Sequence, residues 1–176
     1  MYISQSYQNL LVESHNNKFF SGGSQKFNFI ANYITADIST ILDFGCCWGE
    51  LVDKISTEYP NINCQGYDPG VSRFMSLPNK PSDMLICLDV LEHIELEFLE
   101  SNLQLIDTLF TKKAVLLVAC YPAGKYLPNG KNAHLIIEND QWWEDKFSQS
   151  INGHITNKIS HDVGKGFEHI YLIEKS

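Results

Sequence analysis

A glycine-rich turn directly after an acid-ended apolar run is the first feature of this sequence that could do chemistry. Asp43 closes the run "ILDF", and Gly45 and Gly49 bracket two cysteines and a tryptophan in the turn that follows. Glycines let a backbone turn tightly and approach a ligand closely, and the next helix begins with N–H groups that favour an anion such as a carboxylate. The turn therefore predicts a ligand site, although an ordinary strand-to-helix turn has the same spacing. The pattern is not the G-x-G-x-x-G of dinucleotide enzymes, which disfavours NAD.

A second acid lies at the end of the next predicted strand. Asp68 precedes Pro69 and Gly70, and it follows Asp43 by 25 residues. A carboxylate in this place can accept two hydrogen bonds from the hydroxyls of a ribose. The alternative is that Asp68 only caps its own Asp-Pro-Gly turn.

A third group of polar residues follows a strand that is apolar on both faces. In "LICLDVLEHIE", Leu88, Asp89 and Val90 come at the strand end, and Glu92 and His93 open a helix, where acids suit the positive end of the dipole. His93 could serve as a general base because its unperturbed pKa lies near neutrality. The alternative role for His93 is to anchor the loop or to pack against a ligand.

The long loop at residues 121–135 is where an acceptor substrate is expected to bind. It is rich in Pro, Gly and Asn, and it carries Tyr121, Asn132 and His134. Long loops after central strands often carry function. Asn132 could orient a hydroxyl or carboxylate, and His134 could take a proton from it; the alternative is that these residues stabilise the loop itself. We name His93 and His134 as the catalytic candidates.

Strands alternate with helices along the chain, which is the pattern of a parallel sheet with right-handed crossovers. The last connection is too short for a crossover, since a parallel return needs a dozen or more residues, so the last strand is expected to run antiparallel at or near one edge. The predicted fold class is α/β, a doubly wound, Rossmann-like and mostly parallel sheet. We expect strands at residues 39–44, 63–67, 83–88, 114–120, 154–160 and 167–175, and helices at 50–59, 95–110 and 137–149.

The length of 176 residues favours one domain. We divide it into an N-terminal helical lid segment, residues 1–35, and an α/β core, residues 36–176. The stretch "FFSGGSQK", residues 19–26, has the small residues of a mobile lid or of a plain loop between helices. Trp142 and Trp143 are adjacent on one helix and cannot both face the core, so one is expected in the core. The other is a candidate to cover the cleft, and the alternative is that it lies on the surface of the helix.

Charge and composition narrow the range of partners. The net charge is −8 and Arg73 is the only arginine; arginine is the usual recogniser of phosphate and guanine, so a small molecule is expected as partner and nucleic acid is not. The five cysteines and six histidines show no paired metal-ligand spacing, and no metal site is predicted. Unpaired cysteines suit a reducing compartment. The N-terminus lacks a signal-peptide pattern and no apolar run could cross a bilayer, so we expect a cytoplasmic protein with no membrane partner.

Three segments resemble the first three signature segments of the class I S-adenosylmethionine-dependent methyltransferases: "ILDFGCCWGELVDKI", "GYDPG" and "SDMLICLDVLEHIE". The flanking segments "FFSGGSQK" and "LPNGKNAHLI" are similar to those of a compact subgroup of this family found in bacteria and phages. The resemblance implies the doubly wound fold with a reversed last strand, the cofactor S-adenosylmethionine and its product S-adenosylhomocysteine. It places the turn after Asp43 along the methionyl part, Asp68 at the ribose, and Asp89 near the amino group and sulfonium. The implied cofactor-binding set is Asp43, Gly45, Cys46, Cys47, Gly49, Asp68, Pro69, Leu88, Asp89 and Val90.

The chain departs from the family pattern at two places. Cys47 stands where the family has glycine, and a side chain at a position of positive φ costs about 1 kcal/mol. A thiol near a helix N-terminus can also have a lowered pKa, so a reactive Cys47 is an alternative. Only residues 69–82 separate Asp68 from the next clear strand, and "SRFMSLP" is expected to be a vestigial third strand. The family's acid that contacts adenine then has no counterpart, with Ser76 at the nearest place.

The predicted function is methyl transfer from S-adenosylmethionine to a small-molecule or peptide-like acceptor. An oxygen, nitrogen or carbon nucleophile would attack the methyl group in line, with His93 or His134 as base where one is required. The alternative is a degenerate cofactor-binding domain that acts through a partner protein without methyl transfer. An NAD-type oxidoreductase is a third, weaker hypothesis. The sequence leaves open the acceptor, its attacking atom and the oligomeric state.

Overall fold

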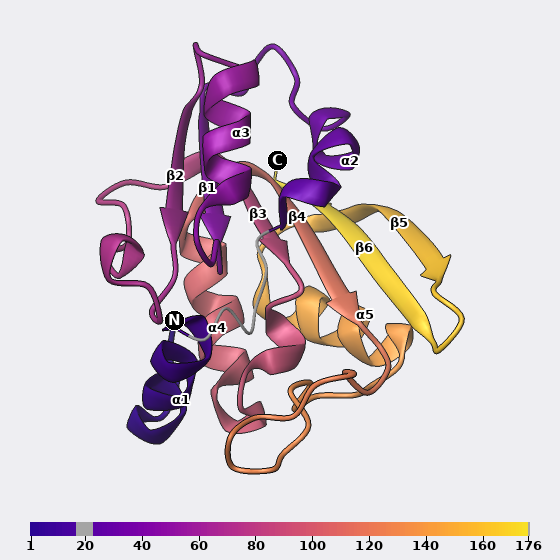
Figure 1. Cartoon of the computed structure of the whole chain (residues 1–176). Helices are drawn as coiled ribbons and strands as arrows, with labels where there is room; N and C mark the ends of the chain where they lie inside the picture. The colour runs from indigo at the N-terminus through magenta and orange to yellow at the C-terminus, as the bar shows by residue number, and fades with distance from the viewer. Residues whose placement is uncertain (17–22, 176) are drawn as a thin grey trace.

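The computed structural model describes residues 1–16 and 23–175, and its centre is a sheet of six strands (Figure 1). The strands are β1 (Thr40–Phe44), β2 (Asn63–Tyr67), β3 (Ser82–Leu88), β4 (Phe110–Ala119), β5 (His154–Asp162) and β6 (Phe167–Glu174). The helices are α1 (Gln5–Asn16), α2 (Phe27–Ala31), α3 (Glu50–Glu58), α4 (Leu96–Thr108) and α5 (Asp140–Ser150), and short 3-10 turns are η1 (Gly23–Lys26), η2 (Ser72–Phe74) and η3 (Leu91–His93).

The strand order is β2-β1-β3-β4-β6-β5. Strands β1 to β4 run parallel to one another, and β6 runs antiparallel between β4 and β5. Strands β5 and β6 form a hairpin, because the four residues between them are too few to cross the sheet. The predicted doubly wound, mostly parallel sheet with a reversed last strand is therefore confirmed, and the reversed strand lies second from the edge.

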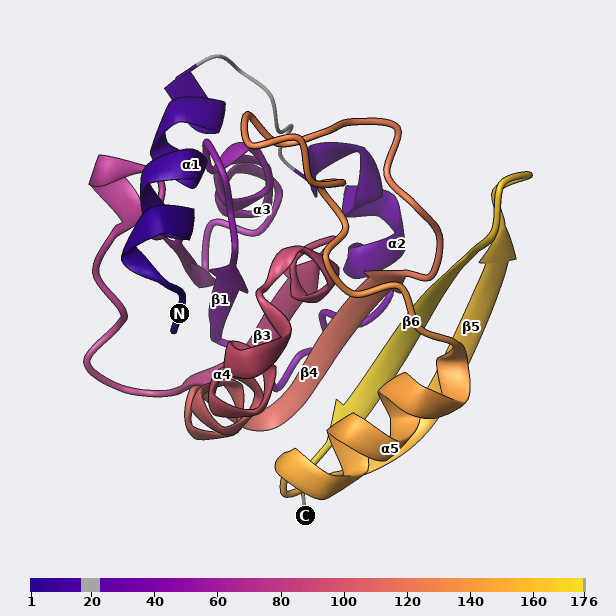
Figure 2. The same cartoon turned by 90° about the horizontal axis from the view of Figure 1, so that it is seen from below.

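Helices cover both faces of the sheet. Figure 2 shows α2 and α3 on one face and α4 and α5 on the other. Alternate residues of a strand face opposite sides, so in β1 Ile41 packs in the cluster with α3 whereas Leu42 packs in the cluster with α4 and α5. The central strands β3 and β4 are buried on both sides, which explains why their sequences are continuous apolar runs.

Two predicted boundaries shift by three or four residues, each for a local reason. Strand β4 begins at Phe110 rather than residue 114, because the polar residues 111–113 continue the ladder beside β3. Helix α5 begins at Asp140 rather than residue 137. The side chain of Asn139 accepts a hydrogen bond from the N–H of Trp142 and so caps the helix at this point.

The expectation of a vestigial third strand at residues 72–78 is wrong. These residues contain the turn η2, and within the described residues β2 is the edge of the sheet. The segment folds back on β2, where the N–H of Asp68 donates to the carbonyl of Phe74 at 2.9 Å. The Phe74 ring fills the space beside Gly49 and Gly66, where an added Cβ would lie 2.4 and 3.1 Å from it.

The carboxyl ends of β1 to β4 point toward α1 and the loop after β4 (Figure 1). Tyr7 and Leu11 of α1 pack with Leu127 and Ala133 of that loop in a small apolar cluster. Helix α1 and the loop therefore close this end of the sheet together. Across the described residues, no helix is both long enough and apolar enough to span a membrane.

Candidate functional site

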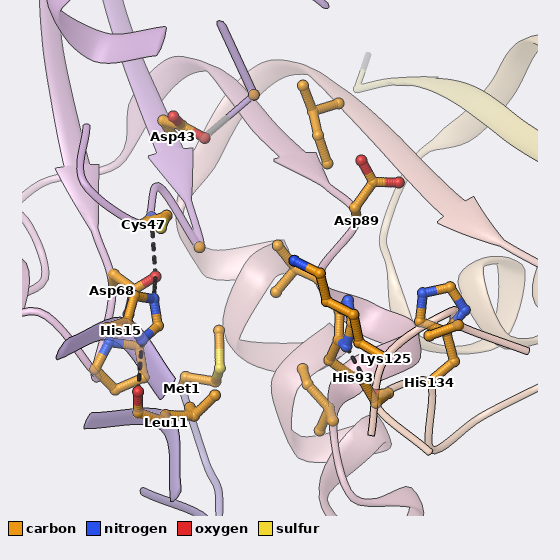
Figure 3. Close-up of a pocket in the computed structure, with 18 of the residues that line it drawn as sticks. Met1, Leu11, His15, Asp43, Cys47, Asp68, Asp89, His93, Lys125 and His134 are labelled. Atoms are coloured by element: carbon orange, nitrogen blue, oxygen red, sulfur yellow. Dashed lines mark hydrogen bonds and ion pairs between the residues drawn. The ribbon is translucent and has the colours of Figure 1, made fainter. Parts of the chain in front are cut away.

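A cavity of about 470 Å³ lies at the carboxyl ends of β1, β2 and β3 (Figure 3). Its walls come from the turn after β1, the ends of β2 and β3, the loop after β4, the β5–β6 turn and α1. Open α/β sheets bind ligands in this position, and all four groups of residues identified in the sequence contribute to it. The predicted site residues that line the cavity are Asp43, Gly45, Cys47, Asp68, Pro69, Leu88, Asp89, Val90, His93 and His134.

The turn after β1 requires glycine at residue 45. Gly45 has a φ of +84°, and a Cβ there would lie 2.3 Å from Cγ2 of Val90. Its N–H donates to the carbonyl of Tyr67 at 2.7 Å, which ties the turn to the end of β2. The turn can therefore pass between the ends of β2 and β3 only without a side chain at this position.

Cys47 adopts the left-handed backbone conformation, with a φ of +51°. For a residue other than glycine this costs on the order of 1 kcal/mol. The backbone N–H of Cys47 donates to Oδ2 of Asp68 at 2.9 Å. The strained residue therefore holds the second acid in place, and its buried side chain forms part of the cavity wall.

Cys46 and Gly49 lie in the same turn but outside the cavity lining. The Sγ of Cys46 packs against Gly66 of β2, and burial raises the pKa of this thiol far above its ordinary value. Gly49, with a φ of +80°, precedes α3 and faces Phe74. Both residues shape the turn, and their neighbours Gly45 and Cys47 are the residues of this turn that line the cavity.

Asp68 is buried in the cavity wall, where it accepts two backbone N–H groups and faces the ring of His15 (Figure 3). Its Oδ1 accepts the N–H of Gly70 at 2.8 Å, its Oδ2 accepts the N–H of Cys47, and Nε2 of His15 lies 3.6 Å from Oδ2. Burial opposes a charge on His15, but the hydrogen bond to Asp68 and the charge of that carboxylate raise the pKa of His15 to about 10. An imidazolium on α1 therefore partly neutralises Asp68 and holds the helix over this side of the cavity.

Asp43 is a second buried acid in the lining, only 4% exposed. Burial, together with the negative charge of Asp68, raises the pKa of Asp43 to about 7. A cation in the cavity would favour the ionised form of this carboxyl. The side of the cavity formed by Asp43 and Asp68 therefore suits a ligand with an ammonium group and hydroxyls.

Asp89 follows β3 with a left-handed φ of +55°. Its Oδ2 lies 2.6 Å from Nζ of Lys26, which also lies 3.5 Å from a carboxylate oxygen of Glu168 on β6. Lys26 ends η1, a turn that contributes two residues to the cavity lining. These ion pairs fix residues 23–26 against the ends of β3 and β6. The other residues of the predicted lid, 19–22, lie outside the described part of the chain.

Two histidines meet on the other side of the cavity. The rings of His93 and His134 are 4.8 Å apart, edge to face. Nδ1 of His93 lies 2.7 Å from the carbonyl oxygen of Ala133, and Nδ1 of His134 lies 2.6 Å from that of Tyr121. A carbonyl only accepts, so each Nδ1 carries the proton and each neutral ring has its lone pair on Nε2. Burial lowers the pKa of His93 to about 4 and also lowers that of His134, so both rings are neutral at pH 7.

Two residues predicted near the acceptor have other roles. Asn132 lies outside the lining, and its side chain bonds the backbone of Ala123 twice and the N–H of His134. The alternative interpretation, stabilisation of the loop, is therefore confirmed for Asn132. Trp143 is fully buried in the core as expected, but Trp142 packs edge-on against it, outside the cavity lining; its placement over the cleft was wrong.

Sequence reasoning missed several residues of this region. His15, Lys125 and Lys165 line the cavity, and Glu92, which was placed at the start of a helix for its charge, is fully buried. The buried face of α1 repeats at helical spacing and includes His15, which was a usable signal. The two lysines lie in loops, where no periodicity exists to place them.

No protein-family model matches the sequence, and no curated protein matches it. Solved structures do match. The 1,6-didemethyltoxoflavin N1-methyltransferase of Burkholderia thailandensis, solved with 1,6-didemethyltoxoflavin and S-adenosylhomocysteine, gives a TM-score of 0.70 at 9% identity over 100% of this chain and 92% of that chain. A Nostoc punctiforme protein assigned as an O-methyltransferase gives 0.60 at 14% identity, over 94% of this chain and 60% of that chain. The [4+2]-cyclase SpnF gives a TM-score of 0.61 at 12% identity, over 86% of this chain and 80% of that chain.

This chain has the class I methyltransferase fold. The reversed strand β6 and the cavity at the ends of β1 to β3 belong to that architecture, so the resemblance in sequence and the likeness in structure agree on the fold. The chain spans 60% of the length of the Nostoc protein. Identities of 9 to 14% establish the class I methyltransferase fold alone.

Proposed function

We propose that the protein is an S-adenosylmethionine-dependent methyltransferase that acts on a small-molecule or peptide-like acceptor. The observation that carries the proposal is that Asp43, Asp68 and Asp89, from the ends of three parallel strands, line one cavity. The Burkholderia neighbour, solved with S-adenosylhomocysteine and a small-molecule substrate, supports both the cofactor and the class of acceptor.

The side of the cavity with Asp43 and Asp68 is proposed to hold the cofactor. Asp43 would bind the methionyl ammonium, and the start of α3 suits the methionyl carboxylate. Asp68 would accept a ribose hydroxyl on Oδ1, because among the described residues this oxygen accepts only the N–H of Gly70 and has room for a further hydrogen bond. Its Oδ2, in contrast, already accepts the N–H of Cys47 and faces His15. The cofactor, when bound, supplies an electrophilic methyl group on a sulfonium.

The side with His93 and His134 is proposed to hold the acceptor. A bond forms from the acceptor atom to the methyl carbon, and the C–S bond breaks with its electron pair passing to sulfur. An acceptor that carries a proton must lose it to a base. His134 is the better base of the two, because the pKa of about 4 makes His93 a weak proton acceptor.

A second function, cofactor binding without methyl transfer and action through a partner protein, is favoured by two observations. Cys47 has a side chain at a position of positive φ where the family has glycine. Ser76, at the nearest place to the family's adenine-contacting acid, is exposed and outside the cavity lining. The fold alone does not decide, since a [4+2]-cyclase shares it.

Calorimetric titration with S-adenosylmethionine and S-adenosylhomocysteine, with NAD as control, tests the proposal. Loss of the charged hydrogen bonds in Asp68→Ala should cost roughly 1.5–3 kcal/mol, about tenfold to a hundredfold in affinity. Asp145→Ala, at an exposed position on α5 outside the cavity, should bind like the wild type. The proposal fails when wild type binds neither sulfur cofactor, or when Asp68→Ala binds as tightly as wild type.

Turnover separates the enzyme from the degenerate domain. Wild type is incubated with methyl-labelled S-adenosylmethionine and fractions of a small-molecule extract. A methyltransferase releases S-adenosylhomocysteine and labels an extract component, and His134→Asn lowers the rate. Cofactor binding with no release above background in any fraction favours the second function.

A further inference from the structure

Three side chains with metal-ligating atoms gather at the acceptor side of the cavity. Glu92, His93 and His134 each offer one such atom, and these atoms all lie within 4.8 Å of one another. His93 and Glu92 belong to η3, and His134 belongs to the loop after β4. The cluster forms because the carbonyl of Glu92 accepts the N–H groups of residues 135 and 136, which fixes the loop beside η3.

Both histidines have the outer hydrogen bonds that are typical of metal ligands. Each Nδ1–H donates to a backbone carbonyl, that of Ala133 for His93 and that of Tyr121 for His134. Such bonds fix the ring orientation and place the lone pair on Nε2. Nearly all metal-binding histidines donate their other ring N–H in this way. The two rings therefore present the correct tautomer for coordination.

Glu92 supplies an independent observation. Its side chain is fully buried, and its Oε1 accepts the N–H of Ala119 at 3.1 Å. Its Oε2 is buried with no hydrogen-bond partner among the described residues. Burying a carboxyl oxygen without a hydrogen-bond partner costs free energy of folding. Within the described residues nothing offsets this cost for Oε2 of Glu92.

We propose that Glu92, His93 and His134 bind a divalent transition-metal ion. Two imidazoles and one carboxylate favour ions such as Mn²⁺, Fe²⁺ or Zn²⁺, whereas Ca²⁺ and Mg²⁺ prefer oxygen ligands alone. With bonds of about 2.1 Å, tetrahedral ligand atoms lie about 3.4 Å apart, so the ligand atoms, which now lie within 4.8 Å of one another, have to approach by at most about 1.4 Å on binding. The proposal departs from the expectation of no metal, which rested on the lack of paired spacing along the chain.

The proposed ion has open coordination positions toward the cavity, because His93 and His134 line it. An acceptor oxygen or nitrogen can bind there as the remaining ligand. This role rests on the proposed function, whereas binding of the ion itself does not. Lys125 lines the same cavity, and its positive charge opposes the binding of a cation there.

The test is metal binding by chelator-treated full-length protein, measured by calorimetry with Zn²⁺ and by electron paramagnetic resonance with Mn²⁺. Wild type is expected to bind one equivalent of an ion. Glu92→Gln and His134→Asn should each lose at least about a hundredfold in affinity. His161→Asn, at an exposed position on β5, is the control and should bind like wild type. Lys125→Met should bind the ion severalfold more tightly.

Thermal unfolding without metal identifies any variant that fails to fold. If the ligand variants fail to fold, Lys125→Met decides whether the site exists, because it should bind the ion more tightly than wild type. The proposal is overturned when wild type binds less than one equivalent at micromolar metal, or when folded Glu92→Gln and His134→Asn bind as tightly as wild type. S-adenosylhomocysteine is titrated separately into the same samples. Metal binding without cofactor binding refutes the methyltransferase and keeps the metal site, and the reverse result refutes the metal site alone.

Discussion

Cofactor binding is expected to depend on pH through Asp43. Burial and the charge of Asp68 raise the pKa of Asp43 to about 7, and the methionyl ammonium is stabilised only by the ionised carboxylate. About one tenth of the molecules carry ionised Asp43 at pH 6, and about nine tenths do at pH 8. The affinity for S-adenosylhomocysteine should therefore rise about tenfold between pH 6 and pH 8.

Calorimetry at pH 6, 7 and 8, in phosphate and in Tris, measures both the affinity and the protons released. At pH 7 binding should release about half a proton from Asp43. Met1 also lines the cavity, and burial lowers the pKa of its amino group to about 6. The comparison is therefore with Asp43→Asn, which should keep any contribution of Met1 and lose that of Asp43. A wild-type affinity that varies less than about twofold, or a variant with the full wild-type dependence, would refute the reasoning.

The same carboxyl sets a dependence of stability on pH. The folded protein keeps the proton on Asp43 up to about pH 7, whereas the unfolded chain releases it near its ordinary pKa of 3.8. This contribution to the free energy of unfolding is fully present below pH 4 and is lost as pH rises to 7, on the order of 4 kcal/mol. In urea unfolding, Asp43→Asn should match wild type at pH 4 and exceed it at pH 8. If wild type is as stable as the variant at pH 8, burial of the ionised Asp43 carboxylate does not destabilise the folded protein.

Two further predictions concern the turn after β1. Gly45→Ala and Gly130→Ala both add a Cβ at positive φ. The Cβ at residue 45 would lie 2.3 Å from Cγ2 of Val90, whereas a Cβ at residue 130 would have no described atom within 4 Å. Gly130→Ala should cost about 1 kcal/mol in denaturant unfolding, and Gly45→Ala roughly 1–3 kcal/mol more; equal losses would contradict the contact. Cys47→Gly should be about 1 kcal/mol more stable than Cys47→Ala, because alanine keeps the left-handed strain. It should also bind S-adenosylhomocysteine at least as tightly as wild type, and weaker binding would mean that the Cys47 side chain is needed for the ligand.

The acids of the cavity could be predicted from the sequence because their positions depend on short-range patterns. Asp43, Asp68 and Asp89 each follow a strand directly, and parallel strands end at the same edge of a sheet. Apolar runs and turn residues suffice to place all three. Apolar patterns fail to place segments whose polarity does not match their position in the sheet. Residues 111–113 are polar and yet continue β4, and residues 72–78 look like a short strand and yet fold back over β2.

The histidine side of the cavity could be predicted only in part, because it depends on packing between distant segments. His134 follows His93 by 41 residues, and the two meet only because the loop after β4 bonds the carbonyl of Glu92. His15 reaches Asp68 only because α1 docks across the strand ends. Spacing along the chain does not predict these contacts, so the scattered histidines did not indicate a metal-ligand cluster.

The charges around the cavity indicate how this chain has to accelerate the proposed reaction. A sulfonium loses its positive charge as the methyl group leaves, so an unpaired carboxylate beside it stabilises the bound cofactor more than the transition state. Asp89 is paired with Lys26 at 2.6 Å, and Asp68 faces the imidazolium of His15, so both acids exert a reduced field. Holding the acceptor in line with the methyl group can supply about 7–11 kcal/mol. Because these two ion pairs anchor η1 and α1, the contacts that neutralise the acids also fix two walls of the cavity in which the proposed reaction would take place.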